Sequence, residues 1–421
     1  MKTAIVGINW GDEGKGRMVD MLSEKYDIVV RYQGGNNAGH TVVNPRGKFI
    51  LNLLPSGILR PEIVNVLGNG MVIDLKHLYQ EITRLRAQGI VITPENLKIS
   101  DKATICLPYH IMQDCLEEER LGDKKFGSTR RGISPVYADK YLKKTLRIGD
   151  LKYKKDVLNK LKDLIEWKSL MFSGYGSAIN YEEIEEWLSM YGDFTLPFIT
   201  DTGEYLLDAD KNGKNIMFEA QLGALRDIDF GIFPFTSSSN TLASYAPIGS
   251  GAPSLKLDTI VGIVKAYSSC VGEGWFTSEL FEQQAEILRT AGGEFGAATG
   301  RPRRVGAFDV LATNYGIEMQ GATELAVTKI DVLGCLEKIP VCVSYKYEDR
   351  ILERFPYPEM LTECKPVIEY LDGWNCNISN CRKLSDLPEN ARKYIKFLQQ
   401  KLNAPIKYIS VGAERDEYME I

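Results

Sequence analysis

One stretch near the N-terminus, residues 7–17, limits what this chain can fold into more than any other. It reads Gly-Ile-Asn-Trp-Gly-Asp-Glu-Gly-Lys-Gly-Arg, follows an apolar run at 4–6, and precedes a run at 18–22 whose apolar spacing suits a helix. Glycines let the backbone approach a polyphosphate closely, N–H groups at a helix start point toward an anion, and Lys15 adds a positive charge. The order of strand, glycine loop and helix therefore predicts a site for a nucleoside triphosphate.

The loop differs from the ordinary P-loop in two respects. Six residues separate its first glycine from Gly14-Lys15, and Gly16 stands where Ser or Thr normally follows the lysine. Without that hydroxyl, a bound Mg²⁺ needs another protein ligand, and Asp12 is the obvious carboxylate inside the loop. A glycine-rich turn that binds nothing is the alternative interpretation of this stretch.

Short apolar runs alternate with longer amphipathic ones, which predicts a large, mostly parallel sheet flanked by helices, an α/β fold. The residues expected in strands are 28–30, 49–51, 64–67, 215–219, 325–327 and, last, 406–409; those expected in helices are 75–86, 156–170, 181–190 and 386–402. Strand signals are absent over about 151–212, so we expect one domain over 1–421 with a helical insertion there. Residues 220–223 are expected to form a loop.

A polar loop is expected at residues 34–41, which contain three glycines and two asparagines. Open parallel sheets bind their ligands in loops at strand ends. His40 lies in this loop and is a candidate functional residue. His77 and His110 fall in helical patterns and are expected to be structural.

Two basic segments could bind anions. Residues 124–144 carry seven Lys or Arg and one acidic residue, and the Gly-Ser-Thr-Arg-Arg-Gly sequence at 127–132 suits a phosphate monoester, although a solvated basic face is the alternative. Arg301, Arg303 and Arg304 follow a glycine turn, and their forked guanidinium groups suit a substrate with two carboxylates. The polar run 236–241 could also bind phosphate oxygens, or could simply be a Ser-rich surface loop.

The sequence Thr-Lys-Ile-Asp at 328–331 follows an apolar run. The carboxylate of Asp331 could accept from both N1–H and the 2-amino group of guanine, a donor pair that adenine lacks. A salt-bridged strand end is the alternative. Together with the Gly14-Lys15 loop, this segment points to GTP.

The overall composition gives no reason to expect nucleic acid or a membrane as partner, since charged residues make up 25% and the formal net charge is −5. No apolar stretch of 18 residues and no signal peptide is visible, so a cytoplasmic protein is expected. The eight cysteines are scattered, which favours reduced thiols over a zinc site.

The segments 10–16 and 31–41, Trp-Gly-Asp-Glu-Gly-Lys-Gly and Arg-Tyr-Gln-Gly-Gly-Asn-Asn-Ala-Gly-His-Thr, resemble the adenylosuccinate synthetase family, and the resemblance continues to the C-terminus. It implies a P-loop-related fold and a homodimeric C–N ligase of purine biosynthesis. Such an enzyme uses GTP and Mg²⁺ to join L-aspartate to inosine monophosphate (IMP) through a 6-phosphoryl intermediate, giving adenylosuccinate for AMP.

The resemblance also implies roles for individual residues. Asp12 would take the proton from N1 of the purine, His40 would stabilise the transferring phosphoryl group, and Asp12 with the carbonyl of Gly39 would hold Mg²⁺. GTP would contact Gly11, Asp12, Glu13, Gly14, Lys15, Gly16, Arg17, Gly39, His40, Thr41, Arg303, Lys329, Ile330, Asp331, Ser410, Val411 and Gly412. The acceptor nucleotide would contact Asn37, Ala38, Thr129, Lys143, Gln221, Leu222, Ser237 and Arg301. Aspartate would contact Ala298, Thr299, Gly300, Arg301, Arg303 and Arg304.

Departures from the family pattern gather on the acceptor side. Asn36 replaces a histidine, Leu222 stands where a glutamine normally faces the acceptor, Lys143 replaces the arginine that reaches the partner's nucleotide, and Cys270 replaces an arginine before the altered segment 271–279. Gln221 could substitute for the lost glutamine through a local shift, or the contact could be absent. Two alternatives therefore accompany IMP ligation: a paralogue that uses GMP or dGMP, and a GTP-binding regulatory protein without ligase activity.

Overall fold

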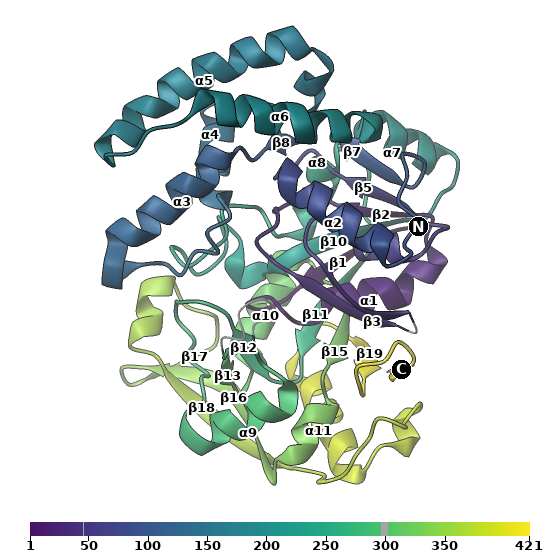
Figure 1. Ribbon diagram of the computed structural model, residues 1–421. Coiled ribbons are helices and arrows are strands. Elements are labelled where there is room, and N and C mark those ends of the chain that lie inside the picture. Colours follow the sequence, from purple (N-terminus) through teal and green to yellow (C-terminus); the bar gives the residue numbers. More distant parts are fainter. Residues whose placement is uncertain (45, 296–301) are drawn as a thin grey trace.

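The computed structural model describes residues 1–44, 46–295 and 302–421 and centres on a ten-stranded sheet (Figure 1). The strand order is β20-β19-β15-β11-β1-β10-β2-β5-β7-β9, and neighbouring strands are parallel except β19 and β20. Their bounds are β1 Lys2–Gly7, β2 Ile28–Arg31, β5 Val64–Leu67, β7 Leu97–Ser100, β9 Ile199–Thr200, β10 Ile216–Gly223, β11 Thr259–Lys265, β15 Glu324–Thr328, β19 Ile406–Ser410 and β20 Tyr418–Glu420.

Strand β1 shows why the middle of this sheet reads as a continuous apolar run. Ile5 packs with Met18 of helix α1 (Lys15–Leu22), whereas Val6 packs with Val30 and Phe218 in a separate cluster. All of these side chains are buried. Helices therefore cover both faces of the sheet, as parallel sheets require.

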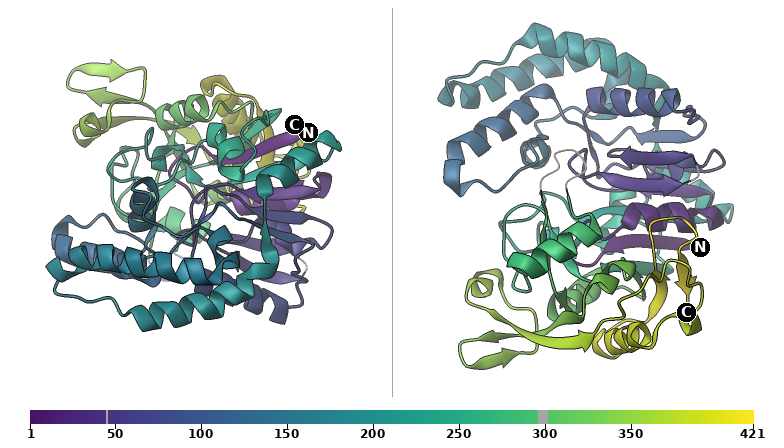
Figure 2. Two further views of the ribbon diagram at one scale, coloured as in Figure 1. Left: turned by 90° about the horizontal axis from the view of Figure 1, so that it is seen from above. Right: turned by 60° about the horizontal axis from the view of Figure 1, so that its bottom comes forward.

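Further helices surround the sheet (Figures 1 and 2). They are α2 Leu75–Ala87, α3 Pro108–Leu121, α4 Ile133–Tyr141, α5 Lys154–Gly174, α6 Tyr181–Thr195, α7 Thr202–Lys211, α8 Ala246–Ser250, α9 Glu282–Gly292, α10 Val310–Gln320 and α11 Glu389–Lys401. Helices α5 and α6 lie side by side at one end of the molecule. At the other end a smaller sheet contains β14 Phe308–Asp309, β16 Lys338–Tyr347, β17 Arg350–Leu352 and β18 Lys365–Asp372.

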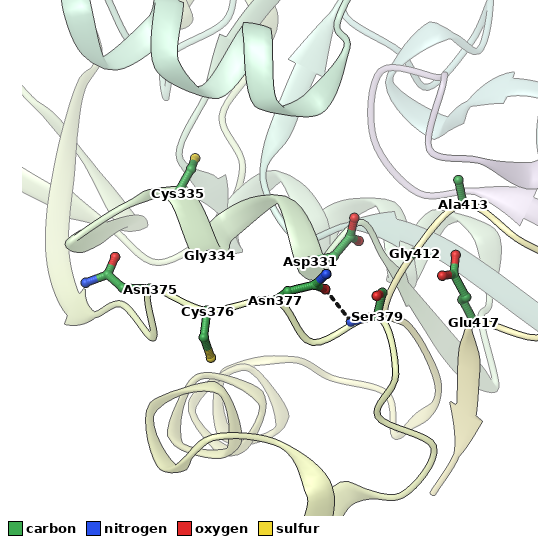
Figure 3. A pocket seen from close by; sticks show the side chains of 10 residues that line it. All are labelled: Asp331, Gly334, Cys335, Asn375, Cys376, Asn377, Ser379, Gly412, Ala413 and Glu417. Carbon is green, nitrogen blue, oxygen red and sulfur yellow. Dashed lines mark hydrogen bonds between the residues drawn. The ribbon is translucent and has the colours of Figure 1, made fainter.

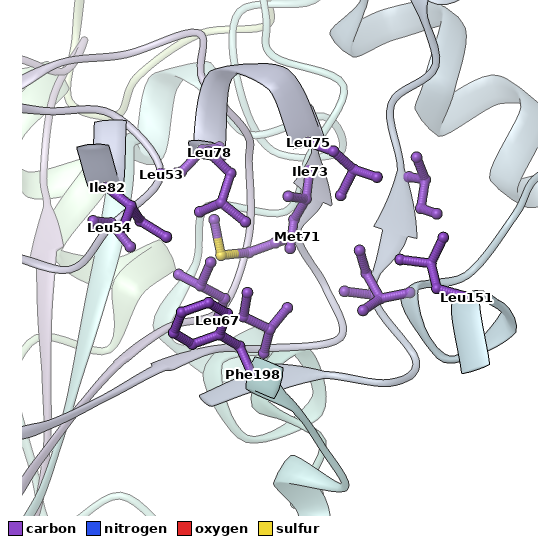
Figure 4. Packing of buried hydrophobic residues seen from close by; sticks show 14 of the residues in the cluster. Leu53, Leu54, Leu67, Met71, Ile73, Leu75, Leu78, Ile82, Leu151 and Phe198 are labelled. Atoms are coloured by element: carbon purple, nitrogen blue, oxygen red, sulfur yellow. The ribbon is translucent and has the colours of Figure 1, made fainter. Parts of the chain in front are cut away.

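The largest apolar cluster lies between α2, the β5–β7 edge of the sheet and the α5–α6 pair (Figure 4). Leu78 and Ile82 of α2 lie in this cluster with Met71 and with Leu67 of β5, and Phe198 lies beyond them, away from α2. Leu161 of α5 and Leu188 of α6 belong to the same cluster. This cluster fixes the helical stretch after residue 150 against the sheet. No helix in the ranges that the model describes is both long and apolar enough to cross a membrane.

The α/β architecture predicted from the sequence is confirmed, but several local predictions are wrong. Residues 220–223 continue β10, because Gly223 pairs with Gly7 and Gln33 Nε2 donates to the carbonyl of Gln221. The expected polar loop ends at Gly39, because His40 opens β3 (His40–Asn44). This strand pairs with β4 (Gly47–Leu51) in a hairpin, so residues 49–51 lie outside the central sheet.

Three further corrections concern the second half of the chain. The stretch 151–212 contains β9, which is only two residues long and joins the edge of the central sheet beside β7. Helix α11 begins at Glu389, because Asp386 instead accepts from the backbone N–H of Lys383. Strand β20 follows the strand expected to be last and pairs antiparallel with it.

Candidate active site

The predicted phosphate loop connects β1 to α1 at the carboxyl end of the sheet. Gly11 and Gly14 have φ of 102° and 95°, and a Cβ on Gly7 would lie 2.3 Å from the carbonyl oxygen of Leu222. Only glycine fits these positions without strain. Lys15 is the first residue of α1, so the loop ends where the helix N–H groups are unpaired and can bind an anion.

Glu13 holds this loop in shape from inside. Its carboxylate accepts from the backbone N–H of Asn9 (3.1 Å) and Gly11 (2.8 Å), and pairs with Lys15 Nζ at 2.6 Å. Both charged groups are almost fully buried. The Oγ1 of Thr328, at the end of β15, donates to the carbonyl of Glu13 (2.6 Å). The segment predicted to bind guanine therefore starts beside the phosphate loop.

His40 packs against the first turn of α1, because a Cβ on Gly16 would lie 2.7 Å from the Cβ of His40. Its Nδ1 lies 2.5 Å from Oε1 of Glu219 in β10. The same carboxylate accepts from Ser56 Oγ and Ser56 N–H, both at 2.7 Å. Glu219 thus fixes the imidazole beside the phosphate loop. No local signal in the sequence indicates this role, because Glu219 lies 179 positions from His40.

Charges around this pair set its protonation. Burial favours a neutral Glu219, but His40, the buried Arg31 and the hydrogen bonds from Ser56 hold its pKa below the ordinary value. Burial lowers the pKa of His40, although Glu219 opposes that shift. The resting pair is therefore a carboxylate that accepts the Nδ1–H of a neutral imidazole, so the bond to Glu219 selects the tautomer.

Asp12 has φ of 60° and a partly exposed side chain that pairs with Arg303. Nη2 of Arg303 lies 3.1 Å from Oδ2 of Asp12, and Nη1 lies 2.9 Å from Oε2 of Glu294. Asp12 and His40 therefore both lie at the phosphate loop, one within it and the other against the helix turn that follows it. The roles predicted for Asp12 and His40 require that the two residues lie close together.

Glu294 links several of the predicted residues and was also missed. It is fully buried beside Lys265 Nζ (2.9 Å), Tyr267 Oη (2.5 Å) and Arg303, with Lys329 Nζ at 3.8 Å. Burial alone would raise its pKa, but the ammonium groups of Lys265 and Lys329 hold it at about 2. This carboxylate is therefore ionised and keeps three cations close to the loop.

A cavity of about 540 Å³ lies among segments that follow β15, β18 and β19 (Figure 3). Asp331 lines it, and Oδ1 of Asp331 is buried without a hydrogen-bond partner among the described residues. Burial raises the pKa of this carboxyl. The other lining residues are Gly334, Cys335, Asn375, Cys376, Asn377, Ser379, Gly412, Ala413 and Glu417. An unpaired acceptor in a cavity is what a base with two adjacent donors would satisfy.

Two cations of the predicted GTP site have partners in the protein. Arg17 donates to Ser410 Oγ and to the carbonyls of Glu414 (2.6 Å) and Glu417 (3.1 Å), so α1 is tied to the loop that follows β19. Lys329 has φ of 59°, and its Nζ donates to the carbonyl of Gly292 at the end of α9. The residues predicted to contact GTP are thus connected around one loop. The lining segment 375–379 carried no signal in the sequence.

On the acceptor side, Gln221 is buried beneath the loop after β2. Its Nε2 donates to the carbonyl of Gly35 (2.8 Å), and a Cβ on Gly34 would lie 1.8 Å from its Oε1. Leu222 has φ of 63° and lies against Gly11 of the phosphate loop. Asn37 accepts from the N–H of Gly35 (3.2 Å) through its side chain.

The loops that carry Thr129 and Ser237 meet each other. Asp114 of α3 accepts from Ser128 Oγ (2.7 Å) and from the N–H of Gly132 (2.8 Å), which fixes the basic loop. Ser238 Oγ donates to Ser134 Oγ (2.7 Å). The first turn of α4, which follows the basic loop, therefore contacts the loop that carries Ser237.

The other residues predicted to bind the acceptor or aspartate either lie outside the phosphate loop and the two loops above, or are not among the described residues. Lys143, with φ of 60°, lies beyond the C-terminal end of α4 with its side chain exposed. Arg304 forms a two-pronged pair with Glu279 and donates to the carbonyl of Gly274 (2.7 Å). Ala298, Thr299, Gly300 and Arg301 lie outside the described residues.

The histidines expected to be structural are placed accordingly. His110 is buried, accepts from the N–H of Leu107 (2.9 Å) and pairs with Asp139 (3.1 Å), which Lys168 of α5 also contacts (2.6 Å). His77 lies on α2, and its Nε2 is 3.3 Å from Oδ1 of Asn52.

The carboxylates of this site could supply some, but not all, of the ligands that Mg²⁺ needs. Within the described ranges, no cluster of three or more His, Cys, Asp or Glu side chains could hold a metal. Of the two carboxylates in the phosphate loop, Glu13 is buried against Lys15 and backbone N–H groups, whereas Asp12 is partly exposed. This fits Mg²⁺, which proteins usually bind through one or two carboxylates together with substrate phosphates and water.

Comparisons with known proteins agree over the whole chain. The family model described as adenylosuccinate synthetase matches residues 4–419. The chain is 44% identical over 418 residues to the adenylosuccinate synthetase of Caldanaerobacter subterraneus subsp. tengcongensis, covering 99% of this chain and 98% of that protein. It is 45% identical over 416 residues to that of Carboxydothermus hydrogenoformans, covering 98% and 97%.

Two solved structures are also similar. Fully ligated adenylosuccinate synthetase from Plasmodium falciparum matches with a TM-score of 0.94 and 36% identity, covering 100% of this chain and 99% of that one. Succinoaminodeoxyadenylate synthetase from cyanophage S-2L, bound to dGMP and dATP, matches with a TM-score of 0.61 and 17% identity over 100% and 95%. The second similarity concerns the fold alone.

Proposed function

This chain belongs to the adenylosuccinate synthetase family, and on that premise we propose that it ligates L-aspartate to C6 of IMP at the expense of GTP. The product is adenylosuccinate, the precursor of AMP, and the enzyme acts in the cytoplasm. One observation carries the assignment of the active site. Asp12 lies in the phosphate loop, and His40 is held by Glu219 against the next helix turn, so the two would flank the end of a bound triphosphate.

The reaction must convert the 6-oxygen of the purine into a leaving group. Asp12 would accept the proton from N1, so that O6 attacks the γ-phosphorus of GTP, the O6–P bond forms and GDP leaves. His40 would hydrogen-bond to the transferring phosphoryl group through Nε2. Glu219, ionised behind Nδ1, favours a protonated imidazole once that negative charge arrives. The amine of aspartate would then attack C6, and phosphate would leave with O6.

The charges of the phosphate groups need neutralising as well. Lys15 would contact the β- and γ-phosphates together with the N–H groups of residues 11–17. Mg²⁺ would be held by the carboxylate of Asp12 and the carbonyl of Gly39, and when bound it would offset phosphate charge. Arg303, which contacts Asp12, would keep that carboxylate in place.

Selectivity for GTP would depend on the cavity beside the loop. The two carboxylate oxygens of Asp331, one of them buried and unpaired among the described residues, would accept from N1–H and the 2-amino group of guanine, while Lys329 and Ile330 would lie along the base. The backbone of Ser410, Val411 and Gly412 would complete the contact. A buried acceptor discriminates strongly, because a base without the matching donors leaves it unsatisfied.

The other substrates would bind on the far side of the phosphate loop. Asn37, Ala38, Thr129, Ser237 and Arg301 would contact IMP, and residues 298–304 would contact aspartate. We further propose a homodimer in which Lys143 reaches the partner's nucleotide, and a single domain in which α5 and α6 form a helical insertion.

Steady-state assays with IMP, GMP and dGMP, each with GTP, aspartate and Mg²⁺, test the proposal. Adenylosuccinate formation from IMP with the highest kcat/KM is the expected result. A higher kcat/KM for GMP or dGMP would replace IMP as the acceptor, and Leu222 is the residue that makes this comparison necessary. GTP binding without aspartate-dependent phosphate release from any acceptor would leave only a regulatory GTP-binding role.

A further inference from the structure

Arg226 is a buried arginine whose hydrogen bonds join two loops of the acceptor side. It ends the short helical turn Ala224–Arg226 that follows β10, and the residue is only 9% exposed. Nη2 donates to the carbonyl of Val271 (2.8 Å) and contacts Sγ of Cys270 (3.0 Å). Nη1 donates to the carbonyls of Phe235 and Glu273 (3.3 Å). One guanidinium therefore holds the backbone at residue 235 and at residues 271–273.

The backbone of Arg226 contacts the first of these loops as well, since its carbonyl accepts from the N–H of Ser237 (2.9 Å). Aromatic packing supports the same junction. The rings of Phe235 and Trp275 meet edge to face at 5.2 Å, and a Cβ on Gly274 would lie 2.7 Å from the Cβ of Phe235. The loop with Ser237 and the segment 271–275 consequently have fixed relative positions.

Cys270 gives this arrangement a particular meaning. In the family pattern an arginine occupies position 270, whereas here a guanidinium reaches the same place from position 226 and lies on the cysteine sulfur. We propose that Arg226 supplies, from the neighbouring loop, the cation missing at position 270, and that it is a positioning residue for the acceptor nucleotide. This inference rests on the proposed function, because it assigns both loops to the IMP side of the site.

The physical basis is the number of partly buried acceptors that depend on one side chain. Carbonyl oxygens partly removed from water need donors, and a guanidinium offers several in a fixed plane. Without it, the loops at 235–237 and 271–275 lose their shared donor. The GTP side does not share this dependence, because its loop is held by Glu13 and its cations by Glu294.

The experiment compares four proteins: the wild type, Arg226→Leu, the double variant Arg226→Leu/Cys270→Arg, and Arg350→Leu as a matched control on the exposed β17. Initial rates give KM for IMP and for GTP, and thermal unfolding monitors the fold. For Arg226→Leu we expect KM for IMP to rise at least about tenfold, with KM for GTP within about twofold. The double variant should recover KM for IMP to within about threefold of the wild type, and the control should match the wild type.

Three results would overturn the inference: an unchanged KM for IMP in Arg226→Leu, equal increases in both KM values, or no recovery in the double variant. If Arg226→Leu does not fold, Arg226→Lys takes its place, since the ammonium keeps the charge but lacks the fork, and the same ratios apply. If the wild type forms no adenylosuccinate, the proposed function fails. The inference is then judged by calorimetric binding of IMP and dGMP to the same four proteins, with Kd in place of KM.

Discussion

Replacing Glu219 by glutamine removes one charge from the active site without changing the shape of the side chain. In the wild type, Oε1 accepts from His40 Nδ1 and Ser56 Oγ, and Oε2 accepts from the N–H of Ser56. An amide offers one acceptor and one donor. Whichever way it is turned, its NH₂ group faces either the Ser56 N–H or the Nδ1–H of His40.

The size of the effect follows from this mismatch. A buried donor left unpaired costs about 1–3 kcal/mol, and hydrogen bonds to charged groups are worth about 1.5–3 kcal/mol. The imidazole could instead carry its proton on Nε2, but it would then lack both the correct tautomer and the carboxylate that stabilises its protonated form. In serine proteases, replacing the corresponding aspartate by asparagine lowers kcat about 10⁴-fold. We therefore expect Glu219→Gln to lower kcat at least about 10²-fold, which corresponds to about 2.7 kcal/mol. KM for GTP should change little.

The assay is steady-state turnover of IMP, with equilibrium binding of GTP and urea unfolding on the same samples. Glu81→Gln is the matched control, because Glu81 is also a buried carboxylate that accepts from two backbone N–H groups, those of Asn52 and Leu53. Both variants should lose about 1–3 kcal/mol of unfolding free energy, but only Glu219→Gln should lose kcat selectively. A folded Glu219→Gln enzyme with kcat within about threefold of the wild type would refute the role given to Glu219.

Three other substitutions test separate parts of the molecule. Asp12→Asn should lower kcat about 10²–10⁴-fold and leave the Kd of GTP within about fivefold, measured by turnover and calorimetry; near-normal turnover would contradict its role as base. Asp331→Asn should reduce the preference for GTP over ITP at least about tenfold, because an amide cannot accept from both guanine donors; an unchanged kcat/KM ratio for the two triphosphates would count against the guanine contact. Asp309, the N-cap of α10, is buried, and burial raises its pKa to about 6 although Ala312 N–H and Tyr345 Oη donate to it. Between about pH 4 and pH 6 the folded state therefore binds more protons than the unfolded state. As pH rises through that range, the free energy of unfolding falls by about 3 kcal/mol on account of this group. Urea unfolding from pH 4 to pH 7 should show a flatter pH dependence for Asp309→Asn, and a parallel curve would disprove the assignment.

Local patterns in the sequence were sufficient for much of the fold. Apolar runs placed β1, β2, β5, β15 and β19, and amphipathic spacing placed α2, α5 and α6. These signals work because burial on both faces of a strand, or along one stripe of a helix, is imposed on consecutive residues. The two-residue strand β9 had too few residues to carry a pattern. The hairpin of β3 and β4 was missed because its glycine-rich approach hid the start of the strand at His40.

The candidate site was likewise predictable only in part. The glycines and Lys15 indicated the phosphate loop because they lie together in the chain. Glu219 and Glu294 could not be found, since each acts through residues from other elements: Glu219 through His40, and Glu294 through Lys265, Arg303 and Lys329. A carboxylate within a strand, as at Glu219, or just after a helix, as at Glu294, is ordinary in sequence, and only its burial among cations shows what it does.

The position of Gln221 decides between two explanations of the departure at Leu222. A local shift that moved Gln221 into the place of the family's glutamine would have to break three hydrogen bonds. The carbonyl of Gln221 accepts from Gln33 Nε2 (2.7 Å), its side chain donates to Gly35, and the carbonyl of Gly223 accepts from Thr241 Oγ1 (3.0 Å). The backbone on both sides of Leu222 is therefore fixed, and under the proposed function residue 222 would offer the acceptor nucleotide an apolar side chain. A leucine has no donor or acceptor with which to distinguish one 6-oxopurine from another. We therefore expect the ratio of IMP to GMP turnover to depend on other groups, and the loops held by Arg226 are the candidates that the Arg226 variants test.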